Sequence, residues 1–309
     1  MLLNTFLTTR YPLMQGGMAQ IATGNFAAAV SNAGALGIIA AGGRDAQGVR
    51  AEIHTLRAQT DKPFGVNVML MAPDVDELAA MLVDEQVPVI TTGAGNPARY
   101  IERWKAAGSK VIPVVPSVSL AQRMEKYGAD AVIAEGTESG GHVGELTTMA
   151  LVPQVVDGVG IPVIAAGGIA TGRQLCAAYA LGAIGAQIGT AVLVSEECPI
   201  HENYKQIILD AKDTATTVTG RALGAPVRII KNKMARAYLK LEQEGADRDA
   251  FESLTLGSLR RAVHDGDRDK GSFMSGQVAG LCREIVPLSV IFERIMTEYE
   301  QARKGLPDL

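Results

Sequence analysis

The feature that most constrains this chain is a short apolar run, ending in glycine or a small polar residue, that recurs about every 20 to 31 residues. Continuous apolarity, as opposed to alternation, is what a strand buried on both faces requires, and such strands belong to parallel sheets. Eight runs have this character: Leu13–Gly17, Leu36–Gly43, Phe64–Met69, Val87–Gly93, Val111–Pro116, Ala131–Glu135, Pro162–Gly168 and Ala186–Thr190.

Amphipathic helical patterns lie between the runs. Pro97 suits the first turn of one helix, and Ser119 and Thr171 suit the N-caps of two others. Alternating strands and helices of this number predict an α/β fold, a (β/α)8 TIM barrel. The rival is an open doubly wound sheet, which usually has a G-x-G-x-x-G corner after its first strand. Gln15–Ala19 has a different pattern, so we expect the barrel.

The pattern changes after the eighth run. Ser195–Asp267 contains no strand-like run, and the periodicity of Val227–Glu244 predicts a long helix, with a second helical region after it. We interpret this stretch as a small helical cap, inserted after strand 8 and lying over the barrel mouth. The predicted organisation is a cofactor-binding barrel of residues 1–195 and 268–309 and a cap of residues 196–267.

Composition excludes several classes of function. The 309 residues have a net charge of −4 and a pI near 5.7, which argues against a nucleic-acid binder. The three cysteines form no CxxC pair, so neither a zinc site nor a disulfide framework is indicated. The sequence has neither an 18-residue apolar run nor a signal-like start. We expect a soluble, cytoplasmic protein without a membrane partner.

Barrel active sites lie at the carboxyl ends of the strands. These ends are rich in glycine and neutral polar groups, and Glu135 and His142 are the only candidate metal ligands. Two ligands are too few for a catalytic zinc site, so we predict no metal. The last two strand ends, Gly167-Gly168 and Gly189-Thr190, predict a phosphate site beside a helix that begins near Thr171. The alternative is that these glycines only turn the chain.

A glycine-rich loop, Glu135–Gly144, surrounds one histidine. Ser139, Gly140 and Gly141 leave space for the backbone to approach a flat ligand, and His142 can reach a ligand bound there. The plainer alternative is a turn with an incidental surface histidine. The remaining histidines, for which surface or capping roles are predicted, are His54, His201 and His264.

Together these residues predict a cofactor with one phosphate and a flat ring over the barrel mouth. Asn67, Glu135 and Gln187 can contact its polar edges, and His142 stands on its open face. Flavin mononucleotide (FMN) fits this description. Pyridoxal phosphate needs a Schiff-base lysine, and none of the eight strand ends carries one.

Several segments resemble the flavin-dependent, type II enoyl-acyl-carrier-protein reductases of bacterial fatty-acid synthesis, within the nitronate monooxygenase (2-nitropropane dioxygenase) family. The resemblance extends over nearly the whole chain. The glycine-rich histidine loop and Gln15–Gly17 are shared by both branches, whereas Thr91–Pro97 and Gly266–Gly280 look more like the reductase. The segments are Gln15–Ala19, Thr91–Pro97, Ile112–Ser117, Glu138–His142, Ala165–Ala170 and Met274–Gln277.

The resemblance implies an FMN-bearing barrel that passes hydride from NADH or NADPH to an enoyl thioester on an acyl carrier protein, with His142 as the catalytic histidine. It also implies a homodimer and an association with a monovalent cation, for which the sequence has no readable site. A mildly basic cap (Lys231, Lys233, Arg236 and Lys240) could attract an acidic carrier. The FMN-holding set carried over by position is Gly16, Gly17, Met18, Asn67, Glu135, Gly167, Gly168, Gly189 and Thr190, with Met274, Gly276 and Gln277 lining the flavin.

Two other functions stay open at this point. In a nitronate monooxygenase His142 would act as a base on the carbon beside a nitro group, with oxygen as the oxidant. The other alternative is a module that binds flavin or an acidic carrier without turnover.

Overall fold

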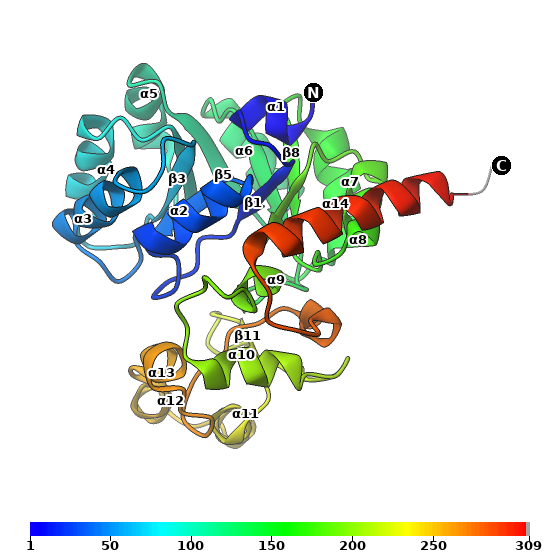
Figure 1. Cartoon of the computed structure of the whole chain (residues 1–309). Helices are drawn as coiled ribbons and strands as arrows, with labels where there is room; N and C mark the ends of the chain where they lie inside the picture. Colours follow the sequence, from blue (N-terminus) through cyan, green and yellow to red (C-terminus); the bar gives the residue numbers. More distant parts are fainter. Residues whose placement is uncertain (307–309) are drawn as a thin grey trace.

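Each of the eight apolar runs forms a strand in the computed structural model, which describes residues 1–306. The strands pair in parallel in the order β1-β9-β8-β6-β5-β4-β3-β2. A bridge between Met14 and Leu36 brings the first and last of these together, so the sheet is a nearly closed ring (Figure 1). The (β/α)8 barrel is confirmed and the open sheet is excluded. The strands are β1 (Leu13–Gln15), β2 (Gly37–Ala40), β3 (Phe64–Met69), β4 (Val89–Gly93), β5 (Lys110–Val115), β6 (Val132–Glu135), β8 (Val163–Ala166) and β9 (Ala186–Ile188).

Helices surround the ring and begin largely where the sequence predicts. Thr171 caps α8 and forms a reciprocal capping box with Gln174. Pro97 precedes α5 directly. The N-cap of α6 is Ser117, whose hydroxyl accepts from the Leu120 N–H, so the expectation of Ser119 was wrong by two positions. The outer helices are α2 (Gly24–Ala33), α3 (Ala46–Arg57), α4 (Val75–Asp84), α5 (Ala98–Ala106), α6 (Val118–Lys126), α7 (Thr148–Gly158), α8 (Gly172–Ala180) and α14 (Leu288–Lys304).

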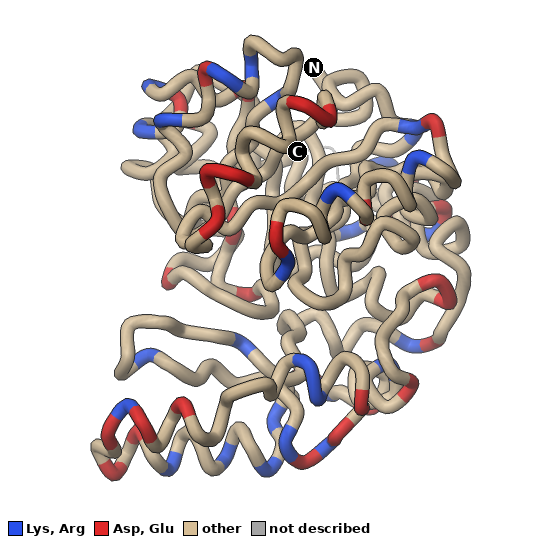
Figure 2. Tube along the Cα trace, turned by 90° about the vertical axis from the view of Figure 1, so that its left-hand side faces the viewer, with Lys and Arg blue, Asp and Glu red and all other residues tan. Residues whose placement is uncertain are grey.

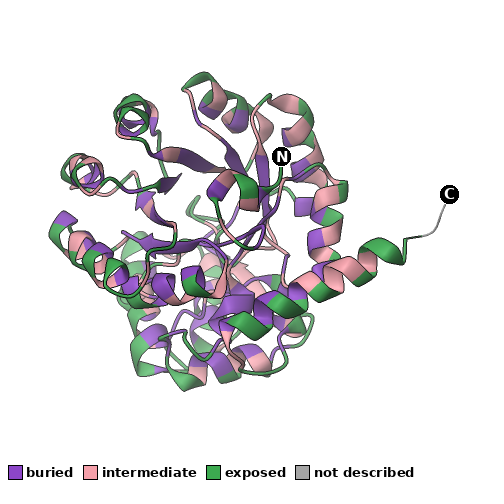
Figure 3. Cartoon of the chain, turned by 45° about the horizontal axis from the view of Figure 1, so that its top comes forward, coloured by how far each residue is buried: buried purple, intermediate pink, exposed green. Residues whose placement is uncertain are grey.

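The interior of the barrel is filled by branched and sulfur-containing side chains. Met14, Ile38 and Ile133 form one buried cluster there, and Leu3 and Leu7 of α1 (Leu3–Leu7) pack against it. The short first helix therefore plugs the amino-terminal end of the barrel, leaving the opposite end as the mouth. Figure 3 shows the strands buried and the outer helices exposed on their solvent side.

The segment predicted as the cap lies below the barrel in Figure 1 and is not purely helical. Two strands, β10 (Thr216–Thr219) and β11 (Val227–Ile230), form an antiparallel pair, and β7 (Gly141–His142) adds to it as a third strand. The predicted helix from Val227 was therefore wrong over its first part and begins at Lys233. The other elements between β9 and α14 are α9 (Thr190–Leu193), α10 (Glu202–Leu209), α11 (Lys233–Glu244), α12 (Arg248–Thr255), α13 (Ser258–Arg260), η1 (Arg261–Asp265) and η2 (Gln277–Leu281).

Within residues 1–306, no helix is long and apolar enough to cross a membrane. Cys198 and Cys282 are buried and Cys176 is half-buried, and all three are free thiols. Buried and half-buried thiols of this kind pack as small apolar groups.

Candidate active site

The predicted site residues that follow β1 lie between predicted site residues of two other strands, β3 and β9. A Cβ on Gly17 would lie 2.4 Å from the Asn67 side chain, and one on Gly16 would lie 3.8 Å from Cδ of Gln187. A Cβ on Gly189 would lie 3.8 Å from Sδ of Met18. The segment after β1 therefore links β3 to β9 across the mouth, and Gly17 has no space for any side chain.

The predicted phosphate corners present free backbone donors. Gly167 and Gly168 have φ values of 85° and 74°, a conformation that favours glycine. Their N–H groups donate to no residue within the described part of the chain. A Cβ on Gly167 would lie 2.6 Å from the Gly136 carbonyl oxygen. Successive free N–H groups of this kind form a concave anion site.

The helix near Thr171 does not contribute to that site, contrary to the prediction. The Gly172 N–H donates to Glu298 Oε2 at 2.9 Å, and the Thr171 N–H donates to Gln174 Oε1 at 3.0 Å. The first turn of α8 is thus satisfied by side chains of its own fold. The glycine corners are therefore the clearest candidates for a phosphate at this mouth.

A second group of predicted residues converges from the far end of the sequence. The Gly276 N–H donates to Thr190 Oγ1 at 2.9 Å, and the Gln277 N–H donates to the Glu138 carbonyl at 2.9 Å. A Cβ on Gly140 would lie 2.7 Å from the Ser275 backbone. The segment Met274–Gln277 is therefore packed between the histidine loop and the last barrel strand.

The loop after β6 is held by a carboxylate that the sequence analysis did not single out for the site. Glu138 accepts from the Thr148 N–H at 3.0 and 2.9 Å and from its hydroxyl at 2.9 Å. Thr148 is the first residue of α7, where a carboxylate also benefits from the helix dipole. The same hydroxyl lies 2.8 Å from the Gly167 carbonyl, which ties the loop to the phosphate corner.

Glu135 ends β6 at the mouth. The residue is half-buried, yet its carboxyl group is enclosed by protein, and this desolvation raises its pKa from 4.5 to about 7. The Ser139 hydroxyl, 3.3 Å from Oε1, partly offsets the effect by donating to the ionised form. Near neutral pH the carboxyl can therefore offer either a donor or an acceptor to a ligand.

His142 lies on β7, and not on a free loop as expected. Val227 of β11 is its pairing partner, and the Val143 N–H donates to the Pro226 carbonyl at 3.1 Å. The imidazole is exposed and forms no hydrogen bond to any residue between 1 and 306. Its backbone is thus fixed by the cap while its ring stays available to a ligand.

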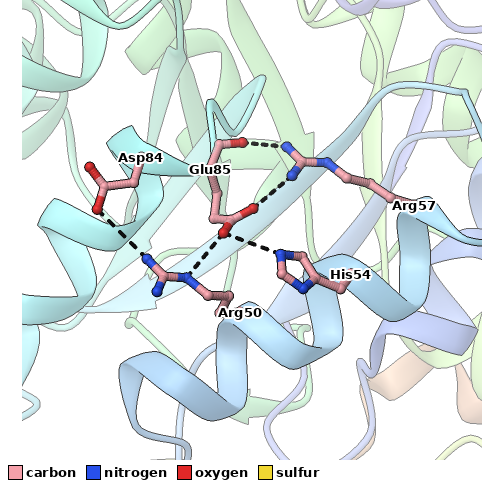
Figure 4. A network of polar contacts seen from close by, with 5 residues as sticks. All are labelled: Arg50, His54, Arg57, Asp84 and Glu85. Carbon is pink, nitrogen blue, oxygen red and sulfur yellow. Dashed lines mark hydrogen bonds and ion pairs between the residues drawn. The ribbon is translucent and has the colours of Figure 1, made fainter.

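The other histidines have the structural roles predicted for them. His54 lies on the surface of α3, where Nε2 is 3.3 Å from Glu85 Oε1, and Glu85 also pairs with Arg50 and Arg57 (Figure 4). His201 caps α10 by accepting from the Asn203 N–H. His264 is exposed.

Two buried polar groups near the mouth have no partner within the described residues. They are the Ser275 hydroxyl, 1% exposed, and Nε2 of Gln15, whose Oε1 accepts from the Ile38 N–H. A cleft of about 730 Å³ is lined by Gly168 and Gln277 among others, but by neither of these two residues. The free donors and the glycine corners fit a phosphate-bearing flat cofactor such as FMN. No three His, Cys, Asp or Glu side chains in the described chain gather as metal ligands.

Sequence reasoning missed two supporting residues. Arg228 of β11 donates to the Thr137 carbonyl at 3.0 Å, and the Tyr204 hydroxyl of α10 donates to the Met274 carbonyl at 2.7 Å. For Arg228, the sequence does contain a pattern that indicates its strand. The β-branched runs at 216–219 and 227–230, separated by Gly224 and Pro226, are typical of a β-hairpin.

Comparison with known proteins places these features in a family. The model of the family described as "Nitronate monooxygenase" matches residues 1–83 and 76–298. The structure of FabK from Thermotoga maritima is 49% identical with a TM-score of 0.95, covering 98% of this chain and 96% of that chain. A probable nitronate monooxygenase of Staphylococcus aureus (strain JH9) is 34% identical, with 97% of each chain covered.

A third relative, from Mycobacterium tuberculosis, is (3aS,4S,5R,7aS)-5-hydroxy-7a-methyl-1-oxo-octahydro-1H-indene-4-carboxyl-CoA dehydrogenase, 30% identical over 96% of this chain and 95% of its own length. Fold, site and similarity define the class of protein: a (β/α)8-barrel oxidoreductase. The chain belongs to the nitronate monooxygenase family, and within that family it is FabK-like.

Proposed function

We propose that the protein is an FMN-dependent enoyl-acyl-carrier-protein reductase that uses NADH or NADPH. The observation that carries the proposal is the similarity to FabK, 49% identical along 98% of this chain. The same similarity includes the late segment Met274–Gln277, which the structure packs against the histidine loop.

The mouth residues suit FMN in three groups. The free N–H groups of Gly167 and Gly168, with Gly189 and Thr190, would hold its phosphate. Asn67, Glu135 and Gln187 would contact its polar edges. The glycines at 16, 17, 140, 141 and 276, with Met18, Ser139, Met274 and Gln277, would enclose it. When bound, FMN supplies hydride transfer between the nicotinamide and the C2=C3 bond of a trans-2-enoyl thioester.

His142 supplies the acid for this reaction. Negative charge develops on the thioester oxygen as the double bond is reduced, and a protonated imidazole can stabilise it or donate a proton toward C2. The exposed ring of His142, free of protein partners, is suited to this. General acid assistance of this kind is typically worth about 10² to 10⁴ in rate.

A nitronate monooxygenase activity is the second candidate, favoured by the family description and by the Staphylococcus aureus relative. There His142 would remove the proton from the carbon beside the nitro group. His142 would donate a proton in the reductase and accept one in the monooxygenase. Activity toward each substrate therefore distinguishes the two candidates.

The test begins with the absorbance spectrum of the purified protein. We expect a flavin band that NADH or NADPH bleaches without oxygen and that crotonyl thioester restores. Turnover of nitroalkane with oxygen, but not of the thioester, would overturn the reductase. A band that the nicotinamides never bleach would indicate a module without reductase activity.

The matched variants are His142→Ala and His54→Ala. Removing His54 deletes one of the contacts to Glu85 and leaves its two arginine partners (Figure 4). We expect His142→Ala to lower kcat about 100-fold or more with the flavin retained, and His54→Ala to match the wild type. Equal rates in both variants would remove His142 from the mechanism.

The proposed carrier-protein partner has less support from the cap. Figure 2 shows basic and acidic positions mixed over it. Lys233 pairs with Asp269 at 2.6 Å and Lys240 with Glu244 at 3.6 Å, which reduces the free positive charge on α11. A carrier-linked substrate should therefore show only weak salt dependence. The homodimer is a proposal that rests on the family resemblance, and the cytoplasmic location is a proposal that rests on the sequence.

A further inference from the structure

One edge of the cap strand β11 pairs with two segments of the candidate site, the histidine strand β7 and the late segment at Phe273 and Met274. His142 pairs with Val227, and the Ile230 N–H donates to the Phe273 carbonyl at 2.8 Å, next to a bridge between Ile229 and Met274. The histidine strand and the late segment, about 130 residues apart in sequence, are thus aligned by consecutive residues of a third element. The cap contributes backbone directly to the geometry of the mouth.

Arg228 adds a side-chain link at the centre of this arrangement. The residue is 6% exposed, opposite Gly141 in the strand pairing. Its Nε donates to the Thr137 carbonyl at 3.0 Å, and its Nη1 donates to Thr216 Oγ1 at 3.1 Å. One guanidinium therefore spans the loop that leads to His142 and the outer strand of the cap.

Joining two segments through a buried arginine costs free energy, because the charge of the arginine must be removed from water. Burial lowers the pKa of Arg228, and the nearby Glu138 carboxylate opposes this effect. Glu138 in turn holds Thr148 at the start of α7. The charge is therefore compensated by a group of the same loop, and only a planar fork with several donors can reach both partners.

We propose that Arg228 is a positioning residue for the reaction assigned to His142. It fixes the Thr137 carbonyl, and with it the approach to Gly141 and His142, against the cap strand. This inference rests on the proposed role of His142. Misplacement of a catalytic group by about 1 Å can cost about 100-fold in rate, so the loss of this link should act on catalysis more than on folding.

The test uses Arg228→Gln and, as a matched control, Arg221→Gln, which removes an exposed arginine from the tip of the same hairpin. We expect Arg228→Gln to lower kcat about 10-fold or more with little change in KM, and Arg221→Gln to match the wild type. In a His142→Ala background, Arg228→Gln should cost less than about 2-fold, because the two residues act on one step. Equal, additive losses in both backgrounds would overturn the proposal.

A readout without substrate completes the test. Hydrogen exchange measured by mass spectrometry should show faster exchange in peptides covering residues 137–143 of Arg228→Gln, and unchanged exchange in Arg221→Gln. Unchanged protection there would also refute the positioning role. The kinetic cycle is run with whichever substrate the wild type turns over. If the proposed function is wrong, the wild type will not turn over the enoyl thioester. If the proposed role of Arg228 is wrong, only the results for the variants will differ from those expected.

Discussion

Replacing Glu135 by Gln should make the protein more stable at high pH and leave it nearly unchanged at low pH. The folded-state pKa of Glu135 is raised to about 7 from an ordinary 4.5 because protein encloses the carboxyl. A group whose pKa is raised on folding makes its full contribution to the free energy of unfolding below the unfolded-state pKa. This contribution is lost as the pH rises through about 7. Gln keeps the shape and the contact to Ser139 but never ionises.

The magnitude follows from the shift. A difference of about 2.5 pKa units corresponds to roughly 3 kcal/mol of unfolding free energy once both states are ionised. About 1 kcal/mol of that is already lost near pH 5, so wild type and variant should diverge by roughly 2 kcal/mol between about pH 5 and pH 9. For a chain of 309 residues this is a difference of roughly 3 °C in Tm. Water entering the mouth would make the value smaller.

The assay is thermal unfolding of wild type, Glu135→Gln and Glu145→Gln at both pH values. Glu145 is exposed on the segment after β7 and serves as the control for a lost carboxylate in the same region. Comparison at each pH cancels the titration of every other group. A Tm difference between Glu135→Gln and wild type that is the same at both pH values, or that grows toward low pH, would refute the reasoning.

Two further predictions concern how the site is held. Gly140→Ala should lower stability by about 1 to 3 kcal/mol and reduce bound flavin, because its Cβ would meet the Ser275 backbone at 2.7 Å. Gly93→Ala, with no atom within 4 Å of the added Cβ, is its control in the same Tm and absorbance measurements. Lys205→Met should lower the unfolding free energy by about 1 to 3 kcal/mol, because the buried ammonium donates to the Ser195 carbonyl at 2.6 Å. Thermal unfolding against the exposed Lys212→Met measures it, and equal Tm values would contradict it.

The barrel could be predicted from sequence because its signal is local. A strand buried on both faces must be apolar throughout, and runs such as Ile133-Ala134 and Ile164–Ala166 meet that condition without reference to their partners. The ends of those strands then collect at one mouth because all of them are parallel. That is why glycine corners as distant as Gly17 and Gly168 could be assigned to a single site.

The cap could not be predicted in the same way. Val227, Ile230 and Met234 are spaced as on one face of a helix, and the periodicity continues into the real helix α11. What makes Val227–Ile230 a strand is pairing with Thr216–Thr219 and with His142, and the partner in the second case lies 85 residues earlier. Long-range backbone pairing leaves little trace in a single sequence.

The pairing of β7 with β11 explains how a loop so rich in glycine can hold its residues in fixed positions. Glycine leaves the backbone with more freedom than any other residue, which is a poor starting point for a catalytic group. Here the freedom is removed from outside: Glu138 anchors the loop to α7, Arg228 holds Thr137, and β11 fixes Gly141 and His142 as a strand. The glycines thus provide space for a flat ligand, while order comes from the barrel on one side and from the cap on the other. It follows that substitutions in the cap should change catalysis at the barrel mouth without touching any ligand.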